Sequence, residues 1–459
     1  MILLMMVACV QDQMEIPSTE PNEFQAIIQA VSSDREMMGS PNTSFLLFQD
    51  GEILFSQGWG ETYSGESIDE NTRFRIGSVT KMMTAAAIFA LDVPLEIPVQ
   101  DLAPSIDLLK SPNEIAQITT QQLLEHSAGL VDQVAVSEDQ SLSSFMGETF
   151  FSQMFVIAPP GEVWNYSNLN YIVAGYVAEE YAGSEYHEVM NTEIFTPLDM
   201  TRTAFDRSTI LSDGNWAKGN TGEEVITPSS YDSPASWSAG FAWSTAKDLA
   251  SFGQFILEGN TDVMSDEAHQ DFSSSRLSMG VMGDYLRYGN GLMHYDGISS
   301  NAGWHKIDLM YHNGSIPGYG AALYLIPEQN AGFVSLVGGT GLELPSAVLA
   351  SLEYFGLPSA EDFPSDALPV SDFSIYEGVY QDNWNVGEIR VVANASGLEV
   401  EMPRLDEMNV SYDSQWRPYT KHNFTTNIDG YDLLVRFESD SEGRMQYIVH
   451  RAFVGQRIE

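Results

Sequence analysis

The sequence contains little cysteine, little positive charge and no long apolar run. Cys9 is the only cysteine among 459 residues, which excludes an internal disulfide framework and any multi-cysteine zinc or iron–sulfur site. Lys and Arg number 20 against 64 Asp and Glu, which gives a net charge of −44. Phosphate backbones would repel so acidic a chain, so no nucleic-acid partner is expected. The sequence has no apolar run of 18 or more residues, so no transmembrane helix is predicted.

The N-terminal segment resembles an export signal. Residues Met1–Val10 are apolar, too few to span a bilayer, and similar to the hydrophobic region of a signal peptide. Met6-Val7-Ala8-Cys9 resembles a bacterial lipobox, although no Lys or Arg precedes the apolar run. The resemblance predicts a signal and tether over residues 1–20, a membrane tether through lipidated Cys9, and an exported protein in the periplasm or at the cell surface. The alternative is a small buried cysteine in an ordinary N-terminal segment.

The main part of the chain predicts an α+β fold. A hydrophobic content of 43% over 459 residues is enough for a substantial core. Two apolar segments, Ser44–Gln49 and Glu52–Gln57, flank Asp50-Gly51, a strong hairpin signal. Helical patterns follow, and then further strands and a helix, which predicts an antiparallel sheet flanked by helices with an all-helical subdomain. The predicted helices are Met82–Leu91, Gln121–Glu125, Tyr171–Tyr181, Lys247–Leu257 and Leu342–Phe355, and the later strands are Gly320–Ile326 and Gly332–Val337.

The C-terminal part predicts a separate β domain. Residues 357–372 are rich in proline, acidic residues and serine, a composition typical of a domain linker. Residues 373–459 form short alternating segments between Gly, Asn, Asp and Ser clusters, with no helical pattern. We therefore predict one domain over residues 21–356 and a small antiparallel β-barrel or sandwich over residues 373–459. The predicted strands of this second domain are Ile375–Tyr380, Glu388–Val392, Leu398–Met402, Tyr431–Phe437 and Met445–Ala452.

Ser78 and Lys81 form the strongest candidate for a nucleophile and its base. They are three residues apart at the start of an apolar helical pattern, so both side chains lie on one face of a helical turn. A serine hydroxyl is a weak nucleophile until a neighbouring base or cation removes or stabilises its proton, and lysine can do so. The field of a helix N-terminus also favours negative charge at Ser78.

Two other stretches of the sequence match short catalytic patterns by chance: a second S-x-x-K and a Y-x-N. An average composition yields about two chance S-x-x-K matches in a chain of this length. The second copy, Ser244-Thr245-Ala246-Lys247, reads better as a helix start, because Ser244 or Thr245 is a natural N-cap and Thr245 precedes Asp248 at capping-box spacing. Tyr288-Gly289-Asn290 matches a Y-x-N pattern in a glycine-rich, strand-like stretch, where a structural role is favoured.

An ordered set of motifs supports Ser78. Tyr166-Ser167-Asn168 and then His312-Asn313-Gly314 follow it, and S-x-x-K, Y-x-N and a K-T-G element or its histidine variant form the signature of penicillin-recognising serine hydrolases. The chain therefore resembles the β-lactamase-related serine hydrolases of the class C type over about residues 25–355. Accessory stretches occur in the family's order, although Asp199 stands where the family usually has Gly. They are Leu123–Leu130, Pro160-Gly161, Pro197–Met200, Ser238–Gly240 and Ser244–Leu249.

The resemblance implies a role for each matching residue. Ser78 would be the acylated nucleophile, Lys81 would share its proton, and Tyr166 would be the general base, since adjacent cations favour a phenolate. Asn168 would hydrogen-bond Lys81 or the substrate. On the opposite wall, His312 would orient Tyr166 or bind the leaving group, Gly314 would allow close backbone approach, and the amide of Ser315 would form the oxyanion hole together with that of Ser78.

The histidine variant of the third motif bears on the substrate. A mostly neutral His312 binds a carboxylate less strongly than the lysine of class C β-lactamases. This favours a peptidase acting on D-amino-acid-containing substrates, or an esterase, over a dedicated β-lactamase. A class C-like β-lactamase remains one alternative, and an inactive relative that binds peptidoglycan or a protein is another. No metal or other cofactor is expected, because His187-Glu188 lacks the second histidine of a zinc motif.

The start of the second domain, Tyr376–Tyr380, resembles the lipocalin-like β domains often appended to this family. Such a domain either packs beside the catalytic domain as a stabilising appendage or shapes the substrate entrance. The sequence favours the first reading without excluding the second.

Overall fold

The computed structural model describes residues 23–459 with short gaps. Cys9 and the predicted signal segment lie outside the described residues. The gaps are residues 105–116, 133–135, 150–155, 223, 231, 275–276, 282, 341–342 and 441.

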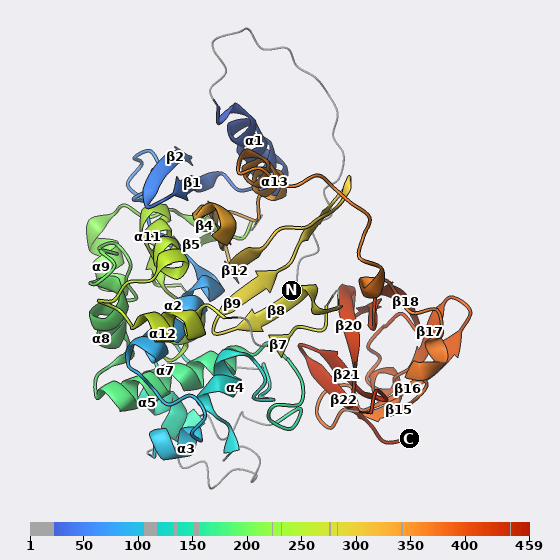
Figure 1. The fold of residues 1–459 in the computed structure, drawn as a ribbon. Helices are drawn as coiled ribbons and strands as arrows, with labels where there is room; N and C mark the ends of the chain where they lie inside the picture. The colour runs from blue at the N-terminus through green and yellow to red at the C-terminus, as the bar shows by residue number, and fades with distance from the viewer. Residues whose placement is uncertain are drawn as a thin grey trace.

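An eight-stranded antiparallel sheet forms the centre of the larger part (Figure 1). Its strand order is β2-β1-β14-β13-β12-β9-β8-β7. Helices lie against both faces, so the predicted α+β class is confirmed. The sheet strands are β1 (Asn42–Gln49), β2 (Glu52–Trp59), β7 (Leu277–Ser278), β8 (Leu286–Gly289), β9 (Leu292–Tyr295), β12 (Leu309–Ile316), β13 (Tyr319–Ile326) and β14 (Ala331–Gly338).

The predicted hairpin at the start of the sheet is present. Asp50 and Gly51 both have left-handed backbone, with φ of 52° and 78°, as a type I′ turn requires. The turn pairs Gln49 with Glu52 and fixes the register of β1 against β2. A local two-residue signal therefore set the pairing of these two strands correctly.

The longer helices match most of the predicted segments to within a few residues. The helix predicted from Leu342 instead begins at Pro345, where proline suits the first helical position. The helices of this part are α1 (Gln25–Met38), α2 (Thr80–Ala90), α3 (Val99–Leu102), α4 (Thr120–Leu124), α5 (Leu142–Ser144), α7 (Asn168–Ala182), α8 (Tyr186–Met190), α9 (Arg207–Asp213), α10 (Trp237–Gly240), α11 (Ala246–Glu258), α12 (Asp266–Phe272) and α13 (Pro345–Tyr354). Short paired strands outside the main sheet are β3 (Phe74–Arg75), β4 (Gly219–Asn220), β5 (Val225–Ile226), β6 (Trp243–Ser244), β10 (Ile298–Ser300) and β11 (Gly303–His305).

Alternating side chains of β1 reach two different cores. Leu46 and Phe48 pack with α2, α7 and α11, whereas Phe45 and Leu47 pack with α1 and α13 on the other face. Strand side chains alternate between faces, so a strand covered on both sides is apolar throughout. The sheet is therefore the middle layer between two helical layers.

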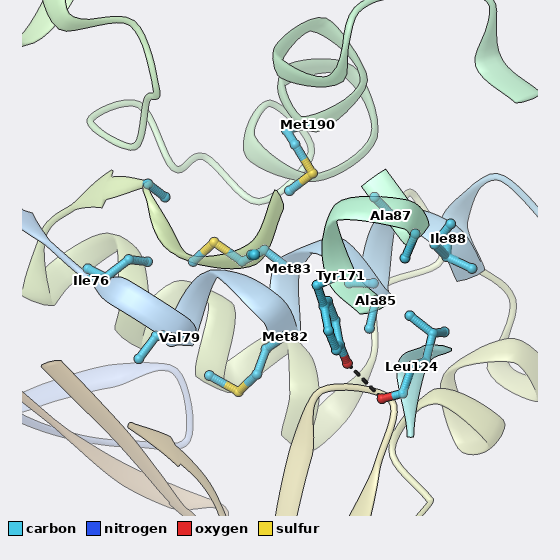
Figure 2. Packing of buried hydrophobic residues seen from close by; sticks show 14 of the residues in the cluster. Ile76, Val79, Met82, Met83, Ala85, Ala87, Ile88, Leu124, Tyr171 and Met190 are labelled. Atoms are coloured by element: carbon cyan, nitrogen blue, oxygen red, sulfur yellow. Dashed lines mark hydrogen bonds between the residues drawn. The ribbon is translucent and has the colours of Figure 1, made fainter. Parts of the chain in front are cut away.

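Helix α2 is buried on all sides, and apart from Thr80, Lys81 and Thr84 its side chains are apolar. Figure 2 shows its side chains surrounded by other elements, including Met190 of α8 and Tyr171 of α7. The Tyr171 hydroxyl donates a hydrogen bond of 2.7 Å to the carbonyl of Leu124. Because α2 is enclosed by these elements, it gives a rigid support for the side chains at its N-terminus.

Helix α1 was not predicted from the sequence. Ile27, Val31 and Asp34 are its only fully buried residues among those described, so its apolar stripe is narrow. Asp34 accepts a 3.0 Å hydrogen bond from the amide of Ala347 in the first turn of α13. The buried carboxyl thus satisfies a helix N-terminus far away in the sequence, a contact that local patterning does not reveal.

The C-terminal part is a closed antiparallel barrel, which confirms the predicted β domain. Strands β18, β19 and β22 and the short helix α14 (Pro403–Glu407) were not predicted. Residues Phe373–Tyr376 form a 3₁₀ turn instead of the start of a strand. The barrel strands are β15 (Gly378–Gln381), β16 (Glu388–Asn394), β17 (Gly397–Glu401), β18 (Gln415–Thr420), β19 (Asn423–Ile428), β20 (Tyr431–Ser439), β21 (Met445–His450) and β22 (Phe453–Arg457).

The strand predicted over Met445–Ala452 ends earlier, at His450. His450 pairs with Phe453, so Arg451 and Ala452 form the tip of the β21–β22 hairpin. The prediction was wrong at this end because neither residue carries a glycine, asparagine or proline turn signal. The difference matters because it places the half-buried Arg451 at a hairpin tip of the barrel instead of within a strand.

One side of the barrel packs against the main domain (Figure 1). Tyr447, Val449 and Val454 belong to the same buried cluster as the helices of the main domain. The indole Nε1 of Trp384 donates a 3.2 Å hydrogen bond to the carbonyl of Val156. The barrel is therefore joined to the main domain by apolar packing and by hydrogen bonds.

The segment between the two domains also contacts the main domain. Glu361 pairs with Trp304 through two backbone hydrogen bonds of 3.0 and 2.8 Å. Further along, the Tyr285 hydroxyl donates a 2.9 Å hydrogen bond to Asp366. Among the residues that the structure describes, none of the helices has the length and hydropathy needed to cross a membrane.

Candidate active site

The N-terminus of α2 brings Ser78 and Lys81 together. Ser78 lies in a 3₁₀ turn, Gly77–Val79, that leads directly into the helix. Lys81 is fully buried one turn later, and its Nζ lies 3.1 Å from Ser78 Oγ. The three-residue spacing thus produces the contact expected of it.

Two carbonyl oxygens hold the Lys81 amine in place. Its Nζ donates a 2.7 Å hydrogen bond to Asn168 Oδ1 and another to the backbone carbonyl of Ala239. Burial holds the pKa of Lys81 well below its usual value, the charge of Arg451 adds to this, and Asp132 opposes it. A lysine with a depressed pKa can serve as a base near neutral pH.

The Lys81 side chain lies over the face of the Tyr166 ring, with Nζ 5.0 Å from the ring centre. Burial raises the pKa of Tyr166 above its usual value, although the charge of Arg451 and a hydrogen bond with Ser78 oppose the rise. The charge of Arg451 does favour the phenolate, as expected from the sequence, but the net shift of the pKa is upward. Desolvation of the charged form outweighs the attraction of that cation.

Asn168 is the first residue of α7. Ser167 caps this helix by accepting a 3.2 Å hydrogen bond from the amide of Leu169. The amide of Asn168 itself donates a 2.7 Å hydrogen bond to Asp132 Oδ1. Asn168 is thus fixed by its backbone while its side chain faces Lys81.

His312 lies on β12, and both of its ring nitrogens are occupied. Nδ1 is 2.6 Å from the carbonyl of Asn313, which can only accept, so Nδ1 carries the proton and Nε2 accepts from the Tyr288 hydroxyl at 3.2 Å. Burial and the charge of Lys81 lower the pKa of His312 to about 3. The ring is therefore neutral, and its centre lies 6.3 Å from that of Tyr166.

Two glycines allow β12 to touch the turn that carries Ser78. A Cβ at Gly314 would lie 1.9 Å from the carbonyl oxygen of Ile76 and 2.7 Å from the Ser78 amide. A Cβ at Gly77, which has a φ of 51°, would lie 2.7 Å from the amide of Ser315. The amides of Ser78 and Ser315 therefore approach each other only because both positions lack side chains.

Replacing Gly314 with Ala is expected to destabilise the protein and displace Ser78. The added methyl group must push β12 away from the turn, which costs about 1–3 kcal/mol in typical overpacked sites. Thermal unfolding should show the loss. The matched control is Gly147→Ala, where no atom of the described residues lies within 4 Å of the added Cβ. An unchanged unfolding temperature for Gly314→Ala would contradict this packing.

Several residues of the site were missed from the sequence. Tyr288, interpreted as structural, binds His312, and the two ring centres are 5.9 Å apart. His126 lies within an accessory stretch that drew attention only as a family pattern. It is fully buried, and its Nδ1 accepts a 3.3 Å hydrogen bond from the amide of Ser167. Asp132 and Arg451 carry no local signal, because they are 319 residues apart.

The second S-x-x-K copy does not form a comparable pair. Thr245 is the N-cap of α11 and accepts a 3.1 Å hydrogen bond from the amide of Asp248, as the capping interpretation predicts. Ser244 is buried and lies 2.8 Å from the hydroxyl of Thr203. Lys247 is exposed on the helix surface. Burial of Lys81 but not of Lys247 distinguishes the two copies.

The sequence of this chain matches a known protein family and several named proteins. A family model described as Beta-lactamase matches residues 27–350. The chain is 27% identical over 276 residues to PbpX of Bacillus subtilis (strain 168), which is named as a penicillin-binding protein, and the match covers 57% of this chain and 67% of that protein. It is 25% identical over 321 residues to the unguisins hydrolase ungD' of Aspergillus campestris (strain IBT 28561), covering 64% of this chain and 59% of that protein.

A solved structure shares nearly the whole architecture. The crystal structure of SurE superposes with a TM-score of 0.70 at 20% sequence identity. The match covers 95% of this chain and 99% of SurE, so it includes most of the C-terminal barrel as well as the main sheet. The curated relatives, by contrast, are matched over only 67% and 59% of their own length.

Proposed function

Because the chain belongs to the Beta-lactamase family, we propose that it is a serine hydrolase that cleaves an amide or ester through an acyl-enzyme at Ser78. The observation that carries this proposal is the contact of 3.1 Å between Ser78 Oγ and the buried amine of Lys81. The depressed pKa of that amine supports its use as a base.

The contacts of Lys81 suit a neutral amine. A neutral amine has two N–H groups and one lone pair. The two N–H groups would be donated to Asn168 Oδ1 and to the carbonyl of Ala239, the two acceptors already in place. The lone pair would then accept the Ser78 hydroxyl proton. This arrangement makes Lys81, and not Tyr166, the group that removes the proton.

Acylation would proceed in two steps, attack by Ser78 and departure of the leaving group, each coupled to a proton transfer. Ser78 Oγ bonds to the carbonyl carbon as its proton passes to Lys81, and the amides of Ser78 and Ser315 would stabilise the developing oxyanion. The bond to the leaving group then breaks. Because its raised pKa keeps Tyr166 protonated, the phenol can donate a proton to the departing oxygen or nitrogen and recover one from Lys81. Water would deacylate Ser78 by the reverse transfers.

The neutral, enclosed His312 bears on the substrate class. Its low pKa removes the cation that would attract a substrate carboxylate at this position. We therefore favour a D-amino-acid-containing peptide or an ester over a β-lactam as the substrate. One curated relative is named a hydrolase, which supports hydrolysis as the reaction. A class C-like β-lactamase is the alternative, and turnover of a chromogenic β-lactam faster than D-amino-acid amides and esters would favour it.

The experiment that tests this proposal is reaction with a fluorophosphonate probe. Intact-mass spectrometry should show one adduct per chain, because serine Oγ displaces fluoride from phosphorus. Peptide mapping should then locate the adduct on Ser78. An adduct on Ser244 would overturn the choice of nucleophile. A folded protein that takes up no probe would overturn the hydrolase and favour the inactive, ligand-binding relative.

A further inference from the structure

The C-terminal barrel reaches the candidate active site through one side chain. Arg451 is at the tip of the β21–β22 hairpin. Strands β21 and β22 lie on the side of the barrel next to the main domain (Figure 1). Its guanidinium carbon lies 4.8 Å from the centre of the Tyr166 ring. Its Nε also donates a hydrogen bond to Asp132 Oδ2.

Asp132 connects Arg451 to the nucleophile through further hydrogen bonds. Its side chain is 7% exposed, and its second oxygen, Oδ1, accepts the 2.7 Å hydrogen bond from the amide of Asn168. The Asn168 side chain in turn accepts from Lys81, which contacts Ser78. A continuous series of hydrogen bonds therefore runs from the barrel to the serine hydroxyl.

Other barrel residues hold the same stretch of the main domain. Along the segment that leads into α7, the Tyr447 hydroxyl donates to Glu162, and Arg436 donates to the carbonyl of Trp164. Arg451 contacts Tyr166, the next residue but one. The barrel thus touches alternate positions of this segment up to a proposed catalytic side chain. A barrel that only packed beside the main domain would not need to contact Tyr166.

Among the described residues, Arg451 forms an ion pair with one carboxylate, that of Asp132. Its side chain is 40% exposed, whereas that of Asp132 is almost fully enclosed. A buried carboxylate that lost its cation would be costly, so the pair is held together strongly. The positive charge of Arg451 therefore neutralises the Asp132 carboxylate.

We propose that Arg451 is a positioning residue for acylation: it contacts Tyr166 directly, and by fixing Asp132 it holds Asn168 against Lys81. The active site is then incomplete without the barrel. This inference rests on the proposed function at Ser78. It assigns the barrel a part in the reaction that a stabilising appendage would not have.

The same contact affects the pH dependence of the reaction. The charge of Arg451 lowers the pKa of both Lys81 and Tyr166, so removing it raises both values. A rate that depends on either deprotonated group must then rise at higher pH. Among the described residues, the titratable or charged groups with a ring contact or an electrostatic interaction with Tyr166 are Lys81, His126, Asp132, Tyr171, Tyr288, His312 and Arg451.

The test is the second-order rate of fluorophosphonate labelling between pH 5 and 10, measured on the full chain. Arg451→Gln is expected to slow labelling by about 10- to 100-fold, because small displacements of reacting groups can cost about 10²-fold. Its pH–rate curve should also move to higher pH. Arg451→Lys keeps the charge but not the planar fork, so it should keep the wild-type pH position and recover part of the rate.

The experiment also needs a matched control and a variant that breaks the same contact from the Asp132 side. The control is Arg417→Gln, which removes an exposed arginine paired with Asp413 on the surface of the barrel domain and should label as wild type. Asp132→Ala should also slow labelling, and the double variant should lose less than the two single losses combined, since both substitutions break the Arg451–Asp132 contact. Asp132→Ala and Arg451→Lys decide the matter if Arg451→Gln does not fold.

The outcomes separate this inference from the proposed function. A wild-type protein that does not label contradicts the function at Ser78 and the inference with it. A labelled wild type with an unchanged rate and pH curve for Arg451→Gln, or an unchanged rate for Asp132→Ala, overturns the inference alone. Additive losses in the double variant would also overturn it, because they would mean that the two residues act separately.

Discussion

Replacing Lys81 with Met is expected to slow fluorophosphonate labelling of Ser78 by about 10³-fold, within the range typical of a lost general base. Methionine keeps much of the buried volume, but its thioether sulfur is not basic enough to take up the serine proton. The buried amine contacts Ser78 directly, with its nitrogen 3.1 Å from Oγ. The rate should be measured by intact mass under excess probe, with Ser78→Ala as the blank.

The control for this prediction is Lys247→Met. Lys247 occupies the equivalent place in the second S-x-x-K copy but is exposed on α11. Its replacement should leave the labelling rate unchanged. Equal rates for wild type and Lys81→Met, in a variant with a normal unfolding transition, would show that Lys81 is not the base.

Replacing Tyr166 with Phe is expected to lower the labelling rate by about 10²-fold while keeping the rise of the rate with pH. The phenol hydrogen-bonds to Ser78, so its loss removes a proton donor and loosens the nucleophile. The rise belongs to Lys81, whose pKa lies well below its usual value of 10.5. A base acts when deprotonated, so a depressed pKa extends its working range downward in pH.

The pH profile distinguishes the two possible bases. Burial raises the pKa of Tyr166 above its usual value of 10.0, so a phenolate base would give a rise only in alkaline solution. That rise would vanish in Tyr166→Phe. Such a result would contradict the assignment of the base to Lys81 and would make Tyr166 the general base, as expected from the sequence. Tyr431→Phe, on the exposed surface of the barrel, is the matched control.

The sequence by itself determined the features that depend on neighbours along the chain. The Asp50-Gly51 turn, the N-cap at Thr245, and the shared face of Ser78 and Lys81 all follow from backbone geometry over four residues or fewer. Alternating apolar segments were enough to predict the α+β fold and the C-terminal β domain. The order of the three motifs was enough to predict the family.

Only the tertiary structure decided the chemical state of the site and the part taken by the barrel. Whether cations or desolvation control Tyr166 depends on how completely the fold excludes water from it, and burial prevails. The pairing of Arg451 with Asp132 joins residues 319 positions apart. No local pattern encodes that contact, because it exists only after the β21–β22 hairpin forms and the barrel packs against the segment leading into α7.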